Sequence, residues 1–304
     1  MKSRHGVGAA LVLALLTAIG ASPLAGQDFE NVQIQTVTVA PGVYMLVGQG
    51  GNLGVSAGSD AVFLVDDQFA PLTEKIRAAI AAFSDRPIKF VLNTHWHFDH
   101  TGGNENLGEG GALIVAHDNV RKRMSVEQFM EAFDRTVPAS PKVALPVVTF
   151  ADGVTFHLND DEIDVFHVPK AHTDGDAIIH FSKANTVHMG DTFFNGFYPF
   201  IDVGSGGSID GVIAAADRVL AMIDDETKII PGHGALSDKA GLAAYRDMLK
   251  GVRESVAKQV AMGKTQEQVI AAKPTAAFDG KWGGGFLNPD QFTAIVYSDL
   301  SRKR

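Results

Sequence analysis

Short apolar segments separated by turn residues dominate the first third of the chain, and one amphipathic helical pattern interrupts them. The apolar segments predict strands over residues 33–39, 43–47, 53–56, 61–65 and 88–92. Pro41-Gly42 and Gly50-Gly51-Asn52 are predicted turns between the early strands. Ile76, Ile80 and Phe83 fall on one helical face, which predicts a helix over 72–83.

The same two patterns alternate through the rest of the chain. Further strands are predicted over 113–116, 154–158, 163–168, 177–181, 186–188 and 228–230. Helices are predicted over 117–133, 208–223 and 237–262, with one or two more in the last 40 residues. Residues 137–146 contain three prolines and are a predicted loop. Since strands and helices alternate in two successive blocks without a fixed repeat, we expect a layered α/β fold.

The first 26 residues differ from the remainder. Lys2 and Arg4 precede an apolar run of about 13 residues, and small residues follow, which is typical of a secretory signal peptide. The run is shorter than the roughly 20 residues that a membrane-spanning helix needs. We therefore predict a signal peptide over 1–26 and a single domain with a helical C-terminal end over 27–304. Retention of the leader as an uncleaved anchor is the alternative; after cleavage no stable membrane insertion is expected.

Composition narrows the possible partners and the compartment. With 26 Lys and Arg against 35 Asp and Glu, the net charge is −9, which disfavours a nucleic-acid partner or a nuclease. The chain has no cysteine, so disulfides, thiolate ligands and a cysteine nucleophile are excluded. Export without disulfides favours a bacterial periplasmic or secreted protein acting on a small-molecule substrate. The pattern does not define an oligomeric state.

The candidate chemistry is concentrated directly after predicted strands. His95 and His97 leave the strand over 88–92 at positions i and i+2, so they can bind one ion together, and Asp99 and His100 follow at once. Three further candidates, each just past an apolar strand, are His172, Asp191 and His233. Imidazole and carboxylate donors suit zinc, although iron or manganese also accept them. The alternative is a histidine-rich surface loop.

In these residues the sequence resembles the metallo-β-lactamase superfamily, whose pattern is H-x-H-x-D-H followed by a distant His, Asp and His. The resemblance covers about residues 30–235 and implies a four-layer αβ/βα sandwich of two mixed sheets between helices. It also implies two Zn²⁺ ions. One would be held by His95, His97 and His172, and the other by Asp99, His100 and His233, with Asp191 bridging both.

The resemblance implies hydrolysis by a metal-activated water that Asp99 orients. An exported enzyme that opens a cyclic amide or ester is expected, and a β-lactam is the favoured substrate. The best-known antibiotic-hydrolysing subclass has a cysteine in place of Asp191 and an arginine-like residue in place of His100. The ligand set is therefore more similar to glyoxalase II and quorum-signal lactonases, so a lactonase or thioesterase is an alternative. An iron-dependent sulfur oxidoreductase and a non-catalytic binding module are further alternatives.

Several other residues carry weaker expectations. Tyr198 and Asn195 are candidates to protonate a leaving group or bind a substrate carbonyl, although Tyr198 is also compatible with a core aromatic. Asp66, at a strand end, could brace the ligand loop through hydrogen bonds. Gly50-Gly51-Asn52 could form a flap over the site or a plain turn. The remaining histidines outside the leader are expected to be ordinary strand or helix residues: His117, His157, His167, His180 and His188.

Overall fold

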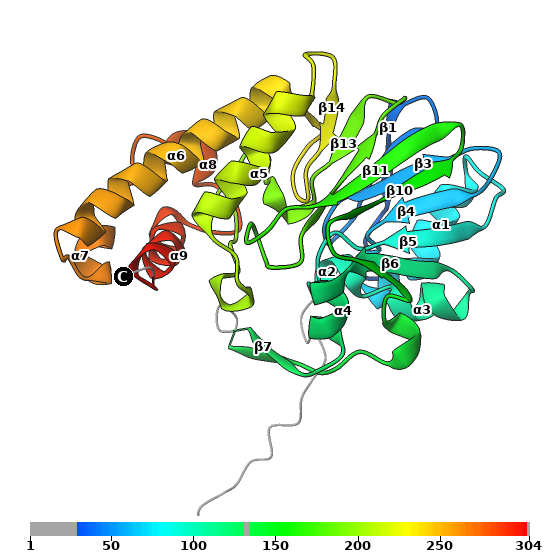
Figure 1. Ribbon diagram of the computed structural model, residues 1–304, viewed down its shortest axis with the longest axis horizontal. Helices are drawn as coiled ribbons and strands as arrows, with labels where there is room; N and C mark the ends of the chain where they lie inside the picture. The colour runs from blue at the N-terminus through cyan, green and yellow to red at the C-terminus, as the bar shows by residue number, and fades with distance from the viewer. Residues whose placement is uncertain (1–28, 131–133, 303–304) are drawn as a thin grey trace, which may run out of the picture.

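Two mixed β-sheets lie face to face in the middle of the molecule, and helices cover their outer faces (Figure 1). The computed structural model describes residues 29–130 and 134–302. The predicted signal peptide over 1–26 lies outside these residues. Within the part that is described, no helix combines the length and the apolar character needed to cross a membrane.

The first sheet contains seven strands in the order β1-β2-β3-β4-β5-β6-β9. Their bounds are β1 (Gln35–Ala40), β2 (Val43–Val47), β3 (Leu53–Ala57), β4 (Val62–Val65), β5 (Ile88–Leu92), β6 (Leu113–His117) and β9 (Val148–Phe150). The strands β1 to β4 form an antiparallel meander, whereas β4, β5, β6 and β9 are parallel to one another. Parallel pairing brings the carboxyl ends of these strands to one edge of the sheet.

The second sheet contains six strands in chain order and is antiparallel except for the parallel pair β13 and β14. Its strands are β10 (Gly153–Leu158), β11 (Asp161–His167), β12 (Ala177–Phe181), β13 (Thr186–His188), β14 (Lys228–Ile230) and β15 (Ser237–Asp238). A separate antiparallel hairpin pairs β7 (Gln128–Met130) with β8 (Arg135–Val137).

The helices form the outer layers. The α-helices are α1 (Thr73–Ala81), α2 (Phe98–Thr101), α3 (Asn104–Glu109), α4 (Asp118–Met124), α5 (Ile209–Met222), α6 (Lys239–Ala261), α7 (Gln266–Ala271), α8 (Asp279–Trp282) and α9 (Pro289–Arg302). Short 3₁₀ helices are η1 (Ala70–Leu72), η3 (Lys142–Ala144), η4 (Gly190–Thr192) and η5 (Val203–Ser205). Helix α1 packs on the first sheet, and α5, α6 and α9 pack beside the second.

Strand β4 shows why four layers form. All four of its residues are buried. Since alternate side chains of a strand point to opposite faces of the sheet, both faces of β4 are covered. Val62 and Leu64 pack under α1, whereas Phe63 and Val65 pack against the second sheet. A strand that is apolar on both faces requires cover on both, so the predicted four-layer sandwich of two mixed sheets is confirmed.

The helix predicted over 117–133 is wrong in its second half. It ends at Met124, and the chain then turns into the β7–β8 hairpin. The Ser125 hydroxyl donates to the carbonyl of Arg121, and the Arg123 side chain bonds Gln128, so local hydrogen bonds stabilise the turn. Apolar spacing alone cannot detect this change of direction.

The C-terminal end is more divided than predicted. Three short helices, α7, α8 and α9, follow α6 where one or two were expected. The strand β9 has three residues and lies in a stretch without a predicted element.

Candidate metal centre

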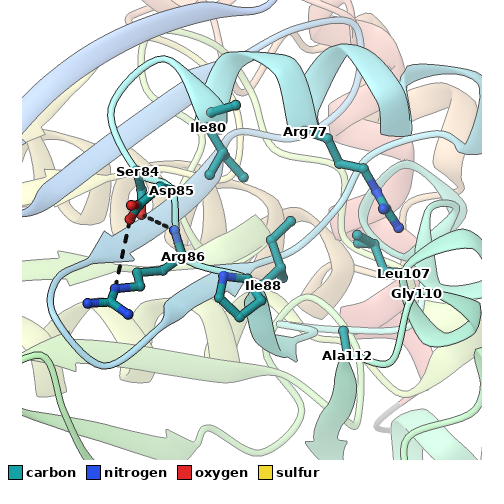
Figure 2. Close-up of a pocket in the computed structure, with 11 residues that line it drawn as sticks. Arg77, Ile80, Ser84, Asp85, Arg86, Ile88, Leu107, Gly110 and Ala112 are labelled. Atoms are coloured by element: carbon teal, nitrogen blue, oxygen red, sulfur yellow. Dashed lines mark hydrogen bonds and ion pairs between the residues drawn. The ribbon is translucent and has the colours of Figure 1, made fainter.

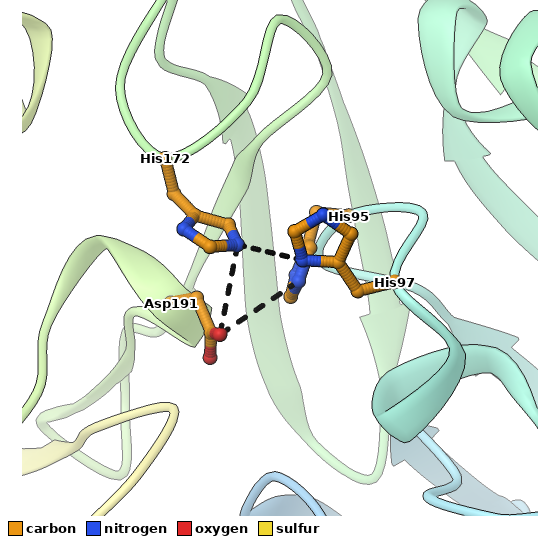
Figure 3. Close-up of side chains that lie close together, drawn as sticks. All are labelled: His95, His97, His172 and Asp191. Atoms are coloured by element: carbon orange, nitrogen blue, oxygen red, sulfur yellow. Dashed lines mark hydrogen bonds and ion pairs between the residues drawn. The ribbon is translucent and has the colours of Figure 1, made fainter. Parts of the chain in front are cut away.

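All seven predicted ligands lie just past the ends of strands from both sheets. Figure 3 shows four of them, His95, His97, His172 and Asp191, with their side chains directed toward one another. His95 and His97 follow β5, and Asp99 and His100 lie in the short helix α2. The other ligands follow strands of the second sheet: His172 after β11, Asp191 after β13 and His233 after β14. The strand ends therefore collect residues that are up to 138 positions apart in the sequence, counting from His95 to His233.

The ligand atoms form two groups. His95, His97, His172 and Asp191 form the first group, and Asp99, His100 and His233 form the second, with the ligand atoms of each group within 4.8 Å of one another. The first group is buried. In the second, the side chains of Asp99 and His233 are 21% and 24% exposed, so this group is the more exposed of the two.

Asp191 connects the two groups. Its Oδ2 lies 3.6 Å from Nε2 of His172 and 3.8 Å from Nε2 of His95. Its Oδ1 lies 3.1 Å from Nε2 of His100 and 3.4 Å from Nε2 of His233. One carboxylate thus presents an oxygen to each group, which is the arrangement that a bridging ligand requires.

In the first group, hydrogen bonds on the outer side fix the orientation of two imidazoles. Nδ1–H of His172 donates to the carbonyl of Phe200 (2.8 Å), and Nε2–H of His97 donates to Oδ2 of Asp202 (3.0 Å). The inner nitrogens, Nε2 of His172 and Nδ1 of His97, then carry lone pairs that face each other at 2.9 Å. Two lone pairs at this distance repel each other unless a cation lies between them, so the pair fits a metal ion.

Asp66 organises one histidine of each group. Its Oδ2 accepts from Nδ1 of His100 (2.8 Å) and from the Thr94 hydroxyl (2.7 Å). Because the Thr94 hydroxyl proton is directed to Asp66, its oxygen accepts from Nδ1 of His95 at 3.0 Å. The inner Nε2 of His95 is buried without a hydrogen-bond partner among the described residues, and so is Oδ1 of Asp191. Buried polar atoms left in this way fit a site built to bind cations.

Burial and charge separate the protonation states of the two groups. Burial lowers the pKa of His172 to about 4 and also lowers that of His95, so both imidazoles are neutral, as metal ligands must be. Burial also disfavours the charged form of His233, but the carboxylates of Asp191 and Asp99 outweigh it and raise the pKa of His233 to about 9. The carboxylates of Asp99 and Asp191 therefore favour positive charge at the group formed by Asp99, His100 and His233.

The turn at Gly50-Gly51-Asn52 is attached to the ligand loop. The Gly51 amide donates to the carbonyl of Asp99 (3.1 Å), and the Asn52 side chain donates to the carbonyls of Pro231 and Gly234. A Cβ atom at Gly51 would overlap the imidazole of His100. The glycine is thus explained by close approach of the backbone to a ligand.

Tyr198 and Asn195, the two weaker catalytic candidates, do not line the cavity beside the metal centre. The Tyr198 side chain is fully buried, its ring stacks on Phe292, and its hydroxyl donates to Asp279 (2.8 Å). Burial beside Asp279 raises its pKa well above the usual range, which disfavours proton transfer. The Asn195 side chain donates to the carbonyl of Ala235. Tyr198 is therefore a core aromatic and Asn195 bonds to the chain after His233, so neither side chain lies where the expected contact with a substrate in this cavity would be made.

A cavity of about 440 Å³ opens on the metal centre and has mostly aromatic walls. Its described lining residues are Gln49, Phe69, His97, Phe98, Asp99, Met130, Arg135, Asp191, Phe194, Phe197, Phe200, His233, Gly285 and Phe286. Gly285 and Phe286 precede α9, so the C-terminal end of the chain closes one side of the cavity. Another hollow, of about 320 Å³, lies beside α1 (Figure 2) and shares no lining residue with the first.

Two features of the site were not predicted from the sequence. Asp202, which orients His97, lies in a segment with no strand-end signal, 105 residues from its partner. The aromatic walls come from four separate segments, and Phe193-Phe194-Asn195-Gly196-Phe197 is the one local cluster that could have indicated them.

Comparison with known proteins agrees with this geometry. The family model of the metallo-beta-lactamase superfamily matches residues 50–233, more than half of the chain. The solved metallo-beta-lactamase from Pontibacter korlensis superimposes with a TM-score of 0.58 at 17% identity, over 72% of this chain and 99% of that one. This chain therefore belongs to the metallo-beta-lactamase superfamily.

The relatives found by sequence are named for thioester-related activities and not for β-lactam hydrolysis. A hydroxyacylglutathione hydrolase from Maricaulis maris is 30% identical over 216 residues, 66% of this chain and 68% of the relative. One from Pelagibacter ubique is 28% identical over 150 residues, 48% of this chain and 52% of the relative. An acyl-coenzyme A thioesterase from Bos taurus is 24% identical over 170 residues, 52% of this chain and 60% of the relative. The match thus spans little more than half the length of two of these three relatives.

Proposed function

We propose that this protein is an exported dinuclear zinc hydrolase that adds water to the carbonyl carbon of a thioester or ester. The observation that carries the proposal is the pair of histidine-carboxylate groups joined by Asp191 at the inner end of an aromatic cavity. The names of the relatives by sequence support thioester or ester substrates.

Zinc fits the donors of both groups, since imidazole nitrogens and single carboxylate oxygens are its usual protein ligands besides thiolate. When bound, a pair of such ions supplies a nucleophilic hydroxide near neutral pH and polarises the carbonyl group. His95, His97 and His172 would hold one ion, and Asp99, His100 and His233 the other, with Asp191 shared between them.

The protein's own contribution is orientation and exclusion of water. Asp99 lines the cavity and is one of the more exposed ligands, so its carboxylate can accept a proton from the hydrolytic water. As the new carbon–oxygen bond forms, that proton passes on to the leaving sulfur or oxygen, and the carbonyl–heteroatom bond breaks. Phe194 stacks on His233, with ring centroids 5.1 Å apart, and restricts the access of bulk water to the more exposed group.

A β-lactam is the second candidate substrate. The aromatic walls suit an apolar acyl side chain, and the leader predicted over residues 1–26 would deliver the enzyme to the compartment where β-lactams act. The best-known antibiotic-hydrolysing subclass has a cysteine ligand where this chain has Asp191, which favours a thioester over a β-lactam as the substrate.

A substrate panel tests the proposal. Zinc-loaded protein would be assayed with a phenylacyl thioester, an acyl-homoserine lactone and the chromogenic cephalosporin nitrocefin, with and without a chelator. We expect chelator-sensitive turnover of the thioester. Turnover of nitrocefin alone would select the β-lactamase, and no turnover by protein containing two zinc ions would contradict hydrolysis of all three classes.

Export is tested separately. Cell fractionation and N-terminal sequencing of the full-length product are expected to give a periplasmic or secreted protein that begins near residue 27. Recovery of the uncleaved chain in the cytosol would contradict export.

A further inference from the structure

Among the described residues that line the cavity at the metal centre, one carries a guanidinium group. Arg135, in β8, lines the same cavity as Asp99, Asp191 and His233, and it is half-buried. Its Cζ lies 4.7 Å from the centroid of the Phe98 ring, and Phe98 lies between two metal-ligand candidates in the chain. Stacking on this ring therefore keeps a positive charge beside the ligand loop.

Arg135 differs in how its charge is balanced from the arginines that form ion pairs, and also from Arg121 and Arg218, which donate to the carbonyls of Pro146 and His167. Arg123 and Arg253 each contact a carboxylate, at 2.7 and 2.8 Å. The side chain of Arg135 makes no ion pair with any residue in 29–130 or 134–302. A half-buried guanidinium among aromatic rings gains more from a carboxylate ligand than an arginine surrounded by water does.

The negative net charge of the chain strengthens the case that Arg135 binds an anionic group. At net −9 the protein repels anions in general, so an anionic substrate needs a local positive site to enter the cavity. Around Arg135, the cavity offers an apolar lining to the rest of the substrate, with Phe69, Phe194, Phe197, Phe200 and Phe286.

We infer that Arg135 binds a carboxylate group of the substrate, and that the substrate is an aromatic or bulky apolar acyl compound bearing that carboxylate. The inference rests on the proposed function for the place where the bond is cleaved. The carboxylate binds at β8, the apolar body contacts the phenylalanines, and the scissile carbonyl faces Asp99 and His233. Arg135 is a binding residue that sets specificity and does not take part in the bond cleavage.

Binding of a matched pair of ligands tests the inference without turnover. Calorimetry would measure 4-phenylbutyrate and its neutral counterpart 4-phenylbutanamide on zinc-loaded full-length protein, on R135Q and R135K, and on R218Q. Arg218 is the matched control, because its guanidinium also stacks on a phenylalanine, with Cζ 4.0 Å from the Phe166 ring centroid, but does not line the cavity.

We expect the acid to bind about 10-fold or more tightly than the amide to the unaltered protein and to R218Q, and R135Q to remove this preference. R135K should retain part of it, because the charge remains and the planar fork is lost. Equal preference for the acid in R135Q and in the unaltered protein would overturn the inference, since the carboxylate would then bind elsewhere, for example at the metal centre.

Turnover is the second readout and separates this inference from the proposed function. For a 4-nitrophenyl monoester of 3-phenylglutaric acid, R135Q should raise KM about 10-fold or more with kcat nearly unchanged, and the methyl-capped diester should show no such effect. An Arg135-dependent preference in binding, together with no hydrolysis of any ester or thioester, would contradict the proposed function and leave the carboxylate site supported. Thermal unfolding of each variant confirms that it is folded.

Discussion

Four of the candidate metal-ligand imidazoles, those of His95, His97, His100 and His172, are oriented by a partner on the outer side, and Asp202 is the partner that no sequence pattern indicates. Its Oδ2 accepts from His97 while its Oδ1 accepts from the Ser205 amide (3.0 Å), so the turn after Asp202 holds the carboxylate in place. The interaction with His97 lowers the pKa of Asp202 despite its burial, so the carboxylate is charged.

Replacing Asp202 therefore tests the outer layer of the site. In D202A the outer nitrogen of His97 loses its acceptor, and we expect zinc affinity to fall about 10- to 100-fold while the ligand set stays complete. Competition with a chromogenic chelator would measure the affinity. D217N, at an exposed ion pair, is the control and should bind zinc as the unaltered protein does. Unchanged affinity in D202A would contradict a positioning role for Asp202.

Tyr198 was a catalytic candidate from the sequence, and its burial leads us to expect that its replacement affects stability and not catalysis. In Y198F the hydrogen bond to Asp279 is lost, so we expect the free energy of unfolding to fall by about 1 kcal/mol. Because the hydroxyl does not line the cavity, kcat should change by less than about twofold, which is well under 1 kcal/mol of activation free energy. Denaturant unfolding and initial rates would measure both, and a large loss of kcat would restore Tyr198 as a proton donor.

The seven ligand candidates could be found from the sequence because they lie in short segments past the ends of apolar strands and together match the pattern H-x-H-x-D-H with a distant His, Asp and His. Asp202 and Arg135 could not, since the partners that give them meaning lie in distant segments and only the fold brings them together. The local pattern around Tyr198 was compatible with two roles, and its burial distinguishes them.

The turn after β2 contacts the metal-ligand candidates so closely that Gly51 cannot be replaced without movement of the turn or of His100. In G51A the new methyl group would overlap the His100 imidazole, so either the turn or the ligand must move. We expect G51A to bind fewer than two zinc ions and to lose most of its activity. G280A, where no atom lies within 4 Å of the added Cβ, is the control. Full zinc content and full activity in G51A would show that the turn can shift without affecting His100.

The segment before α9 brings the C-terminal end of the chain to the cavity. Phe286 is 64% exposed and lines the cavity, so in F286S we expect KM for an apolar substrate to rise about 10-fold with little change in stability. Phe129, 60% exposed and outside the cavity lining, is the control as F129S. Equal effects of the two substitutions on KM would contradict a role for the C-terminal segment in substrate binding.

Element prediction succeeded for short apolar strands bounded by turn residues and failed where the chain changed direction inside an apolar pattern. The strands β2, β5, β12, β13 and β14 match their predicted bounds. The helix predicted over 117–133 was too long, because a hairpin can follow a helix without any break in apolar spacing. The second strand of this hairpin carries Arg135, the residue proposed to bind the substrate carboxylate.

At the scale of the whole molecule, the double layer of sheets explains why one edge can hold so many charged groups. The buried contacts between the sheets and under the helices stabilise the frame, and the strand ends can then bring buried histidines and carboxylates together at one edge. The fold class could be predicted because the ligand pattern is specific as a set. The substrate could not, because the cavity walls come from segments that only the tertiary structure unites.

The proposed function requires the two ligand groups to hold two metal ions that hydrolysis needs. The most direct test is metal content by mass spectrometry on the purified protein, for the unaltered chain and for D191A, beside chelator-sensitive hydrolysis. We expect two zinc ions per chain in the unaltered protein, fewer in D191A, and a parallel loss of activity. Iron with consumption of dioxygen, or two zinc ions retained without Asp191, would contradict the proposed function.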